Sequence, residues 1–263
     1  MPAPYRIADE TYVIPILRHA PPFGVSHFNS FLIRGKESIL VDTGALKEHD
    51  EWQAHLWSLV DPKDIHWVFL THDDREHAGN LMYVLEKCPQ AKVVMHWFSF
   101  LRLADDNIDI PMNRMRLTNS GESLNIGGRG FGVLRPPLFD SPATVGFFDI
   151  QTGVYFSADC FGAPTPDFVQ DVADAPKESV RQNFYAFNRA NEPWCQYVDT
   201  HKYTAELEKV RKLDAKIIAS AHTAPARGAT IPWFLELMAD LPAMEPFAGL
   251  TQEDFEKRQP LAR

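Results

Sequence analysis

The segment THDDREHAGN at residues 71–80 directly follows an unbroken apolar run, 67–70, whose length is that of a buried β-strand. Between His72 and His77 it holds two histidines and three carboxylates. Imidazole and carboxylate are ligands of zinc, iron and manganese, and so many ionisable groups at a strand end would repel one another without cations. The segment therefore predicts a metal site. A solvated acidic loop with incidental histidines is the alternative.

Polar residues follow other strand-like segments in the same way. Three of them carry side chains that bind metals or orient metal ligands: Asp42, Asp159 and His222. Polar groups just beyond the carboxyl ends of buried strands form the usual site of α/β folds. We therefore expect these three residues at the sheet edge that carries residues 71–80.

The remaining sequence supplies the framework for such an edge. Short β-branched and aromatic runs predict strands at residues 11–17, 28–33, 38–41, 67–70, 92–95, 131–134, 145–149, 154–158 and 216–220. Apolar residues at helical spacing predict helices at about 52–60, 78–87, 203–213 and 232–239. Strands precede helices in two similar halves, which favours an α+β fold built as a four-layer αββα sandwich.

Composition excludes several classes of protein. The 263 residues include 26 basic and 35 acidic ones, a net charge of −9, and an acidic surface repels nucleic acid. No apolar run approaches the ~18 to 20 residues of a membrane-spanning helix, and the first residues do not resemble a signal peptide. Three widely spaced cysteines predict no disulfide framework. We expect a cytoplasmic protein with no nucleic-acid or membrane partner.

The pattern H-x-[D/E]-x-[D/E]-H at residues 72–77, with a later aspartate and a last histidine at strand ends, resembles the metallo-β-lactamase superfamily. The flanking sequence is most similar to the lactamase-type domain of flavodiiron proteins. The matching stretches lie at residues 24–33, 39–44, 71–80, 139–141, 156–162 and 219–222. The resemblance implies a four-layer metallo-β-lactamase sandwich at residues 1–241, followed by a C-terminal tail or arm at 242–263.

The resemblance also implies two bound metal ions, with iron favoured and zinc or manganese as alternatives. Six residues match the family's ligands: His72, Asp74, Glu76, His77, Asp159 and His222. The first two would bind one metal, Asp159 would bridge, and the others would bind the second metal. No catalytic residue beyond these ligands is predicted. The order Asp74 then Glu76 reverses the family's usual Glu then Asp.

One ligand of the family is missing. The family places a histidine where this chain has Pro137, in the run RPPLFDS at residues 135–141, and proline has no side-chain donor. The first metal would keep three ligands, which leaves either an open position or a weak, depleted site. Four residues are candidates for a substitute ligand or for orienting the ligands: Asp42, His27, His96 and Asp140. Asp42 is expected to accept a ring N–H from a ligand histidine.

Two functions follow as hypotheses, with a third held open. In flavodiiron proteins, electrons reach the diiron centre from FMN on an attached flavodoxin domain, and this chain is too short after residue 230 to hold one. The first hypothesis is a non-haem diiron oxidoreductase, a homodimer, that binds or reduces O₂ or NO with a separate electron-donor protein. The alternative is a zinc or manganese hydrolase of a phosphodiester, thioester or lactone. A metal-depleted sensor or binding protein is the third possibility.

Overall fold

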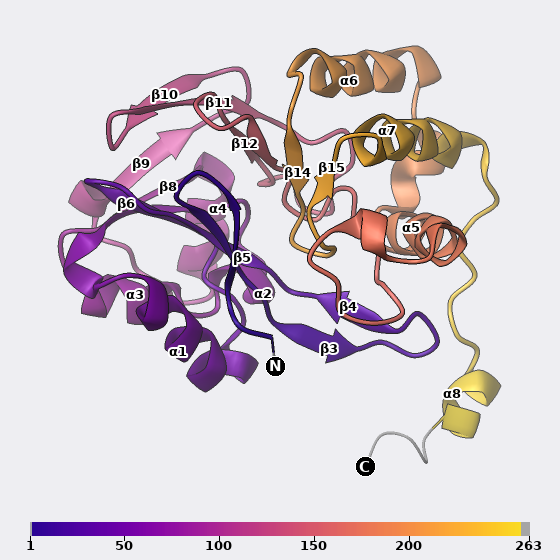
Figure 1. Cartoon of the computed structure of the whole chain (residues 1–263), viewed down its shortest axis with the longest axis horizontal. Coiled ribbons are helices and arrows are strands. Elements are labelled where there is room, and N and C mark those ends of the chain that lie inside the picture. Colours follow the sequence, from indigo (N-terminus) through magenta and orange to yellow (C-terminus); the bar gives the residue numbers. More distant parts are fainter. Residues whose placement is uncertain (1, 259–263) are drawn as a thin grey trace.

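Two β-sheets face each other in the computed structural model, which describes residues 2–258 (Figure 1). The first sheet has the spatial order β1 (Tyr5–Ala8), β2 (Thr11–Ile14), β5 (Ser30–Ile33), β6 (Ser38–Val41), β7 (Ile65–Phe69), β8 (Lys92–His96) and β9 (Met115–Thr118). The second has the order β10 (Ser123–Ile126), β11 (Arg129–Leu134), β12 (Gly146–Asp149), β13 (Val154–Phe156), β14 (Ile217–Ala219) and β15 (Ala226–Arg227). A separate hairpin joins β3 (Leu17–His19) to β4 (Val25–His27).

Helices cover the outer face of each sheet. The first sheet packs against α1 (His49–Leu59), α3 (Leu81–Lys87) and α4 (Trp97–Asp105), and α2 (Arg75–Ala78) precedes α3. The second sheet packs against α5 (Lys177–Asn191), α6 (Thr200–Lys212) and α7 (Thr230–Asp240). Between the sheets lies a buried layer rich in phenylalanine, with members from both sheets: Phe31, Phe69, Phe131, Phe147 and Phe156. The predicted αββα sandwich is confirmed.

The element boundaries differ from the sequence prediction at several points. The predicted helix at 78–87 begins at Leu81 as α3, after Asn80 with φ −100° and ψ 13°, and a separate short helix, α2, covers Arg75–Ala78. Strand β13 ends at Phe156, two residues early, because Ala158 takes a left-handed conformation with φ 53°. The sequence also missed α4, β9 and β10. The two strands lie in a segment that contains many turn residues.

The topology gathers the carboxyl ends of several strands along one edge of the sandwich. Strands β6, β7 and β8 run parallel in the first sheet, and β13 and β14 run parallel in the second. Parallel neighbours end at the same edge, so the segments that follow these strands lie together. The site described below is built on those segments.

The last part of the chain leaves the sandwich. Residues 242–258 of the predicted arm include α8 (Gln252–Arg258), which Figure 1 shows apart from the two sheets; residues 259–263 of that arm lie outside the described residues. Short 3-10 helices occur at Leu46–Glu48, Pro62–Asp64, Met112–Arg114, Val172–Asp174, Pro193–Tyr197 and Leu241–Ala243. Within residues 2–258, no helix offers an apolar stretch long enough to cross a lipid bilayer.

Replacing Phe147 tests how much the layer between the sheets stabilises the fold. Its side chain is fully buried and its ring centroid lies 4.4 Å from that of Phe69. Phe147→Ala should lower the free energy of unfolding by about 3–5 kcal/mol, because it leaves a cavity between the sheets. Ile150→Ala is the control, since Ile150 is 62% exposed. This substitution should change the free energy of unfolding by less than about 0.5 kcal/mol. Urea unfolding measures both; similar losses in the two variants would contradict this assignment of the core.

Candidate metal centre

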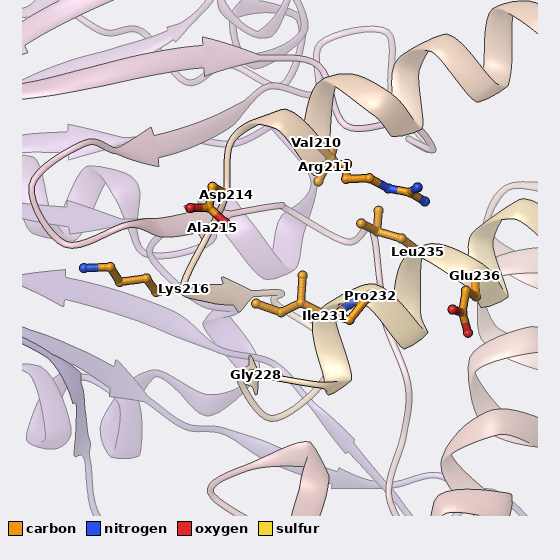
Figure 2. Close-up of a pocket in the computed structure, with 10 residues that line it drawn as sticks. All are labelled: Val210, Arg211, Asp214, Ala215, Lys216, Gly228, Ile231, Pro232, Leu235 and Glu236. Carbon is orange, nitrogen blue, oxygen red and sulfur yellow. The ribbon is translucent and has the colours of Figure 1, made fainter.

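Two cavities differ sharply in chemistry. One, of about 620 Å³, lies between the end of α6 and the start of α7 (Figure 2). Its described lining side chains include four charged ones but no histidine or cysteine: Val210, Arg211, Asp214, Ala215, Lys216, Ile231, Pro232, Leu235 and Glu236. The other, of about 490 Å³, is lined by charged residues of the 71–80 segment and of α4, namely Asp73, Asp74, Arg75, Glu76 and Arg102. Two of the predicted metal ligands, Asp74 and Glu76, therefore line the second cavity.

The six predicted ligands lie on segments that follow buried strands. His72 and Asp74 lie on the turn after β7, and Glu76 and His77 lie on α2. Asp159 follows β13 in the second sheet, and His222 follows β14. The side chains form three overlapping groups whose donor atoms lie within 4.8 Å of one another: His72, His77 and Asp159; Glu76, His77 and His222; and His72, Asp74 and Asp140.

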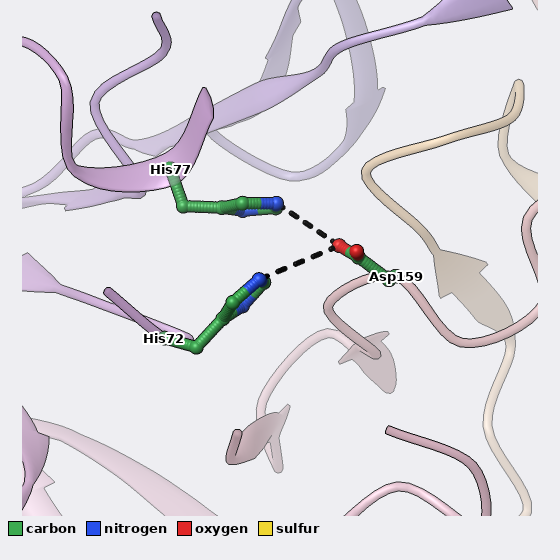
Figure 3. A group of neighbouring side chains, drawn as sticks. All are labelled: His72, His77 and Asp159. Atoms are coloured by element: carbon green, nitrogen blue, oxygen red, sulfur yellow. Dashed lines mark ion pairs between the residues drawn. The ribbon is translucent and has the colours of Figure 1, made fainter. Parts of the chain in front are cut away.

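Asp159 is the point on which the histidines converge. Its Oδ1 atom lies 2.9 Å from His77 Nε2, 3.2 Å from His222 Nε2 and 3.9 Å from His72 Nε2. Figure 3 shows the rings of His72 and His77 directed at the Asp159 carboxylate. Nevertheless, Asp159 Oδ1 and the Nε2 atoms of His72 and His77 have no hydrogen-bond partner among the described residues. These three buried atoms therefore face one another without a hydrogen bond that satisfies them.

The other ring nitrogen of each histidine faces an oxygen acceptor. His77 Nδ1 lies 2.9 Å from Asp42 Oδ2, and His222 Nδ1 lies 2.9 Å from the backbone oxygen of His27. His72 Nδ1 lies 3.2 Å from the Thr71 hydroxyl. That hydroxyl donates its single proton to Asp42 Oδ2 at 2.8 Å, so it can only accept from His72. In the neutral rings, the proton therefore lies on Nδ1 and the lone pair of Nε2 faces inward.

The electrostatics of the cluster favour a positive charge at its centre. Burial opposes ionisation of Asp159, but the charges of His222, His77 and His72 outweigh it and hold the Asp159 pKa well below its usual range. Burial likewise opposes a charged His77, but Asp159 and Asp42 raise its pKa well above the usual value. The pKa of His222 is raised for the same reason by Asp159. A metal cation at this centre would compete with protons for these rings, because histidine binds metals in its neutral form.

Asp42 holds this arrangement from the end of β6. Its backbone is left-handed, with φ 59°, and its side chain is buried. Oδ1 accepts from the backbone N–H of Thr71 at 2.8 Å, while Oδ2 accepts from the Thr71 hydroxyl and from His77. A carboxylate behind a ligand histidine fixes the orientation of the ring. The contact of Asp42 with His77 Nδ1 is therefore suited to orienting that ring.

The other candidate residues have separate places. The His27 side chain is buried, with Nε2 3.4 Å from the Thr165 hydroxyl; burial and the neighbouring His222 lower its pKa to about 4. His96 accepts from the backbone N–H of Phe98 and so caps α4; it belongs to none of the three donor groups of the described residues. Pro137 is buried on the loop between β11 and β12, and Asp140 on that loop joins His72 and Asp74.

Three neighbours of the site were missed by the sequence prediction. Arg102 of α4 forms ion pairs with Asp73 and, at 3.3 Å, with Asp74 Oδ1. Asn191 at the end of α5 lies between Asp159 and the buried Glu192, with Nδ2 3.4 Å from Asp159 Oδ2 and 3.0 Å from Glu192 Oε1. Burial, together with the negative charges of Asp159 and Asp140, raises the Glu192 pKa well above its usual value. Arg102 lies on α4, and Asn191 and Glu192 lie at the end of α5, where no sequence motif marks them.

The donor set fits metal ions. Donors at roughly 2.0–2.2 Å from one cation can lie at most about 4.4 Å apart, and the distances from Asp159 Oδ1 to the three Nε2 atoms all satisfy this limit. Buried polar atoms without hydrogen bonds are rare in folded proteins, and three of them meet here. One donor group contains His72 and Asp74, and another contains Glu76, His77 and His222. Asp159 Oδ1 lies within 3.9 Å of the Nε2 atoms of all three histidines, so these residues could hold two metals with Asp159 between them.

Known proteins resemble this chain over much of its length. A family model described as "ODP family beta lactamase" matches residues 26–223. The protein named diflavin flavoprotein A 1 of Thermosynechococcus vestitus is 34% identical over 137 residues, which are 52% of this chain and 24% of that protein. The anaerobic nitric oxide reductase flavorubredoxin of Salmonella arizonae is 28% identical over 142 residues, or 52% and 29% of the two lengths. The chain thus spans about a quarter of each of these curated relatives.

The solved structures agree on the fold. The rubredoxin oxygen:oxidoreductase of the anaerobe Desulfovibrio gigas matches with a TM-score of 0.80 over 92% of this chain and 62% of that one. Sequence identity is 17% in this comparison, so the likeness shows a shared architecture. The sandwich is therefore the metallo-β-lactamase fold found in flavodiiron proteins.

Replacing Asp42 tests whether metal binding depends on the orientation of His77. Asp42→Asn keeps the size of the side chain and tolerates the left-handed backbone, but it loses an acceptor that serves Thr71 and His77. Metal affinity should fall by about 10- to 100-fold, as measured by calorimetric titration of the metal-free protein with Fe²⁺ under anaerobic conditions. Asp50→Asn, on the surface of α1, should bind like the wild type. Equal affinities for all three proteins would contradict the orienting role.

Proposed function

Because this chain belongs to the ODP beta-lactamase family, we propose that it is a non-haem diiron protein of the flavodiiron type that binds or reduces O₂ or NO. One observation carries the proposal: three buried histidines, each with Nδ1 next to an acceptor, direct Nε2 at the single oxygen Oδ1 of Asp159. A bridging carboxylate between two groups of donors is the arrangement that a pair of metal ions requires.

The composition of the donor set supports iron. Four carboxylates contribute to the donor groups or to their centre: Asp74, Glu76, Asp140 and Asp159. Oxygen-rich sets with a few imidazoles suit iron and manganese, whereas structural and many catalytic zinc sites have more nitrogen or sulfur ligands. The buried Cys160 beside Asp159 belongs to none of the donor groups of the described residues, so the set has no thiolate.

The names of two relatives support the choice of substrates. One is named an anaerobic nitric oxide reductase and the other a rubredoxin oxygen:oxidoreductase. This chain covers 29% of the first protein and 62% of the second. The proposal also keeps two expectations that the family resemblance implies: a separate protein that donates the electrons, and a homodimer of this chain.

A bound diiron centre would supply redox electrons and coordination positions for a small diatomic molecule. The protein's own residues hold and shield the centre. Asp42 and Thr71 set the tautomers of His77 and His72. The rings of Phe28 and Phe187 pack on His222, with centroid distances of 5.0 and 5.2 Å. These apolar contacts limit the access of water to the imidazole and strengthen its electrostatic contact with Asp159.

The proposal is tested by the metal content of the protein isolated from iron-replete cells without added metal. Elemental analysis should find close to two irons per chain, because the donor groups support two sites. The optical spectrum of the reduced protein should change on exposure to O₂ or NO. His77→Ala should lose most of the iron, and His201→Ala, on the surface of α6, should keep it.

Other results would contradict the proposal. Zinc or manganese in place of iron, with a spectrum indifferent to O₂ and NO, would favour a hydrolase that uses a metal-bound hydroxide, and a screen of phosphodiesters, thioesters and lactones would follow. Full iron content in His77→Ala would show that the iron binds elsewhere.

A further inference from the structure

The sequence supplies one ligand fewer for the first metal position than the family pattern contains. Its expected ligands are His72, Asp74 and the bridging Asp159, and Pro137 stands where the family has a fourth. In the structure, Pro137 is buried in the loop between β11 and β12 and has no side-chain donor to offer. A metal held by three protein ligands keeps an open coordination position unless another side chain reaches it.

The same loop brings Asp140 to that position. Asp140 Oδ1 lies 3.8 Å from His72 Nε2, almost the same as the 3.9 Å that separates His72 Nε2 from Asp159 Oδ1. Asp140, His72 and Asp74 have donor atoms within 4.8 Å of one another. The His72 side chain is fully buried and its Nε2 has no hydrogen-bond partner among the described residues. That orphaned nitrogen therefore faces two carboxylates across distances that a shared cation can span.

The loop is fixed on both sides of Asp140. The carbonyl oxygen of Phe139 accepts from Trp194 Nε1 at 3.0 Å, and the ring centroids of Phe139 and Trp194 are 4.9 Å apart. The carbonyl oxygen of Pro142 accepts from Arg135 Nη2 at 2.7 Å. The Thr144 hydroxyl lies 3.4 Å from Asp140 Oδ1. Because these contacts hold the loop in place, the Asp140 carboxylate would lose little conformational freedom on binding a metal.

A nearby cation offsets the additional negative charge. Replacing a neutral imidazole by a carboxylate adds one charge to a group that already includes Asp74 and Asp159. Arg102 lies beside this group, with Nη2 3.3 Å from Asp74 Oδ1 and a second contact to Asp73. The Asp140 side chain is 18% exposed, so solvent lowers the cost of its charge. The local charges therefore permit a carboxylate in this position.

We propose that Asp140 is the substitute ligand of the first metal, so that this position has one histidine and three carboxylates, with Asp159 shared. The inference rests on the proposed two-metal function and adds a ligand that the family pattern does not contain. Such an oxygen-rich position favours iron or manganese over zinc relative to the second position, which has two histidines.

The test is metal stoichiometry. Metal-free protein receives Fe²⁺ under anaerobic conditions or, in parallel, Zn²⁺. Elemental analysis after desalting gives the bound equivalents, and calorimetric titration gives their affinities. Wild-type protein should bind two equivalents. Asp140→Asn should keep one equivalent and bind the second at least about 10-fold more weakly. Asp140→Glu retains a carboxylate and should bind the second equivalent more tightly than Asp140→Asn does. Asp105→Asn, which removes a charge from the nearby acidic cavity, should bind like the wild type.

The outcomes separate this inference from the proposed function. Two equivalents bound by Asp140→Asn with unchanged affinity would overturn the role of Asp140 and leave the diiron function standing. If the wild type bound two zinc ions but no iron, and Asp140→Asn lost one zinc ion, Asp140 would stand as a ligand and the diiron function would be overturned. Fewer than two equivalents of either metal in the wild type would overturn the inference. Urea unfolding of each metal-free variant checks that its fold is intact.

Discussion

Both carboxylate oxygens of the buried Asp42 are used inside the protein, and the order of the metal site depends on them. One oxygen accepts from the Thr71 backbone, and the other accepts from the Thr71 hydroxyl and from His77. Because the hydroxyl proton is committed to Asp42, Thr71 presents a lone pair to His72. A single carboxylate thus sets the tautomers of two histidines. Burying its charge is costly, and three donors compensate for that cost.

Much of the site could be predicted because its chemistry follows buried strands. Asp42, His72, Asp159 and His222 stand just after apolar runs, and parallel strand ends meet at one edge whatever the details of packing. The sequence therefore allowed a prediction of which residues gather at this edge of the sandwich. Asp140 was one of several candidates for the missing ligand, because the path of a loop between antiparallel strands is not encoded by any short pattern.

The parts that could not be predicted depend on contacts between distant segments. Residues 93–101 are mostly apolar, but the chain passes from β8 into α4 at His96, whose side chain caps the helix by accepting from Phe98. That cap places Arg102 beside Asp73 and Asp74. Asn191 and Glu192 reach the site because α5 packs on the second sheet. Side-chain positions of this kind follow from tertiary packing, which local propensity does not determine.

The ligands come from both halves of the sandwich. His72, Asp74, Glu76 and His77 follow β7 of the first sheet, whereas Asp159 and His222 follow strands of the second. A cation bound at Asp159 would therefore connect the two sheets through its ligands, in addition to the packing of the phenylalanine layer between them. Removing the cation would destabilise the segments that carry its ligands before it affects the phenylalanine layer. Amide hydrogens after β7 and β13 would then exchange with solvent sooner than those in the middle of the same strands.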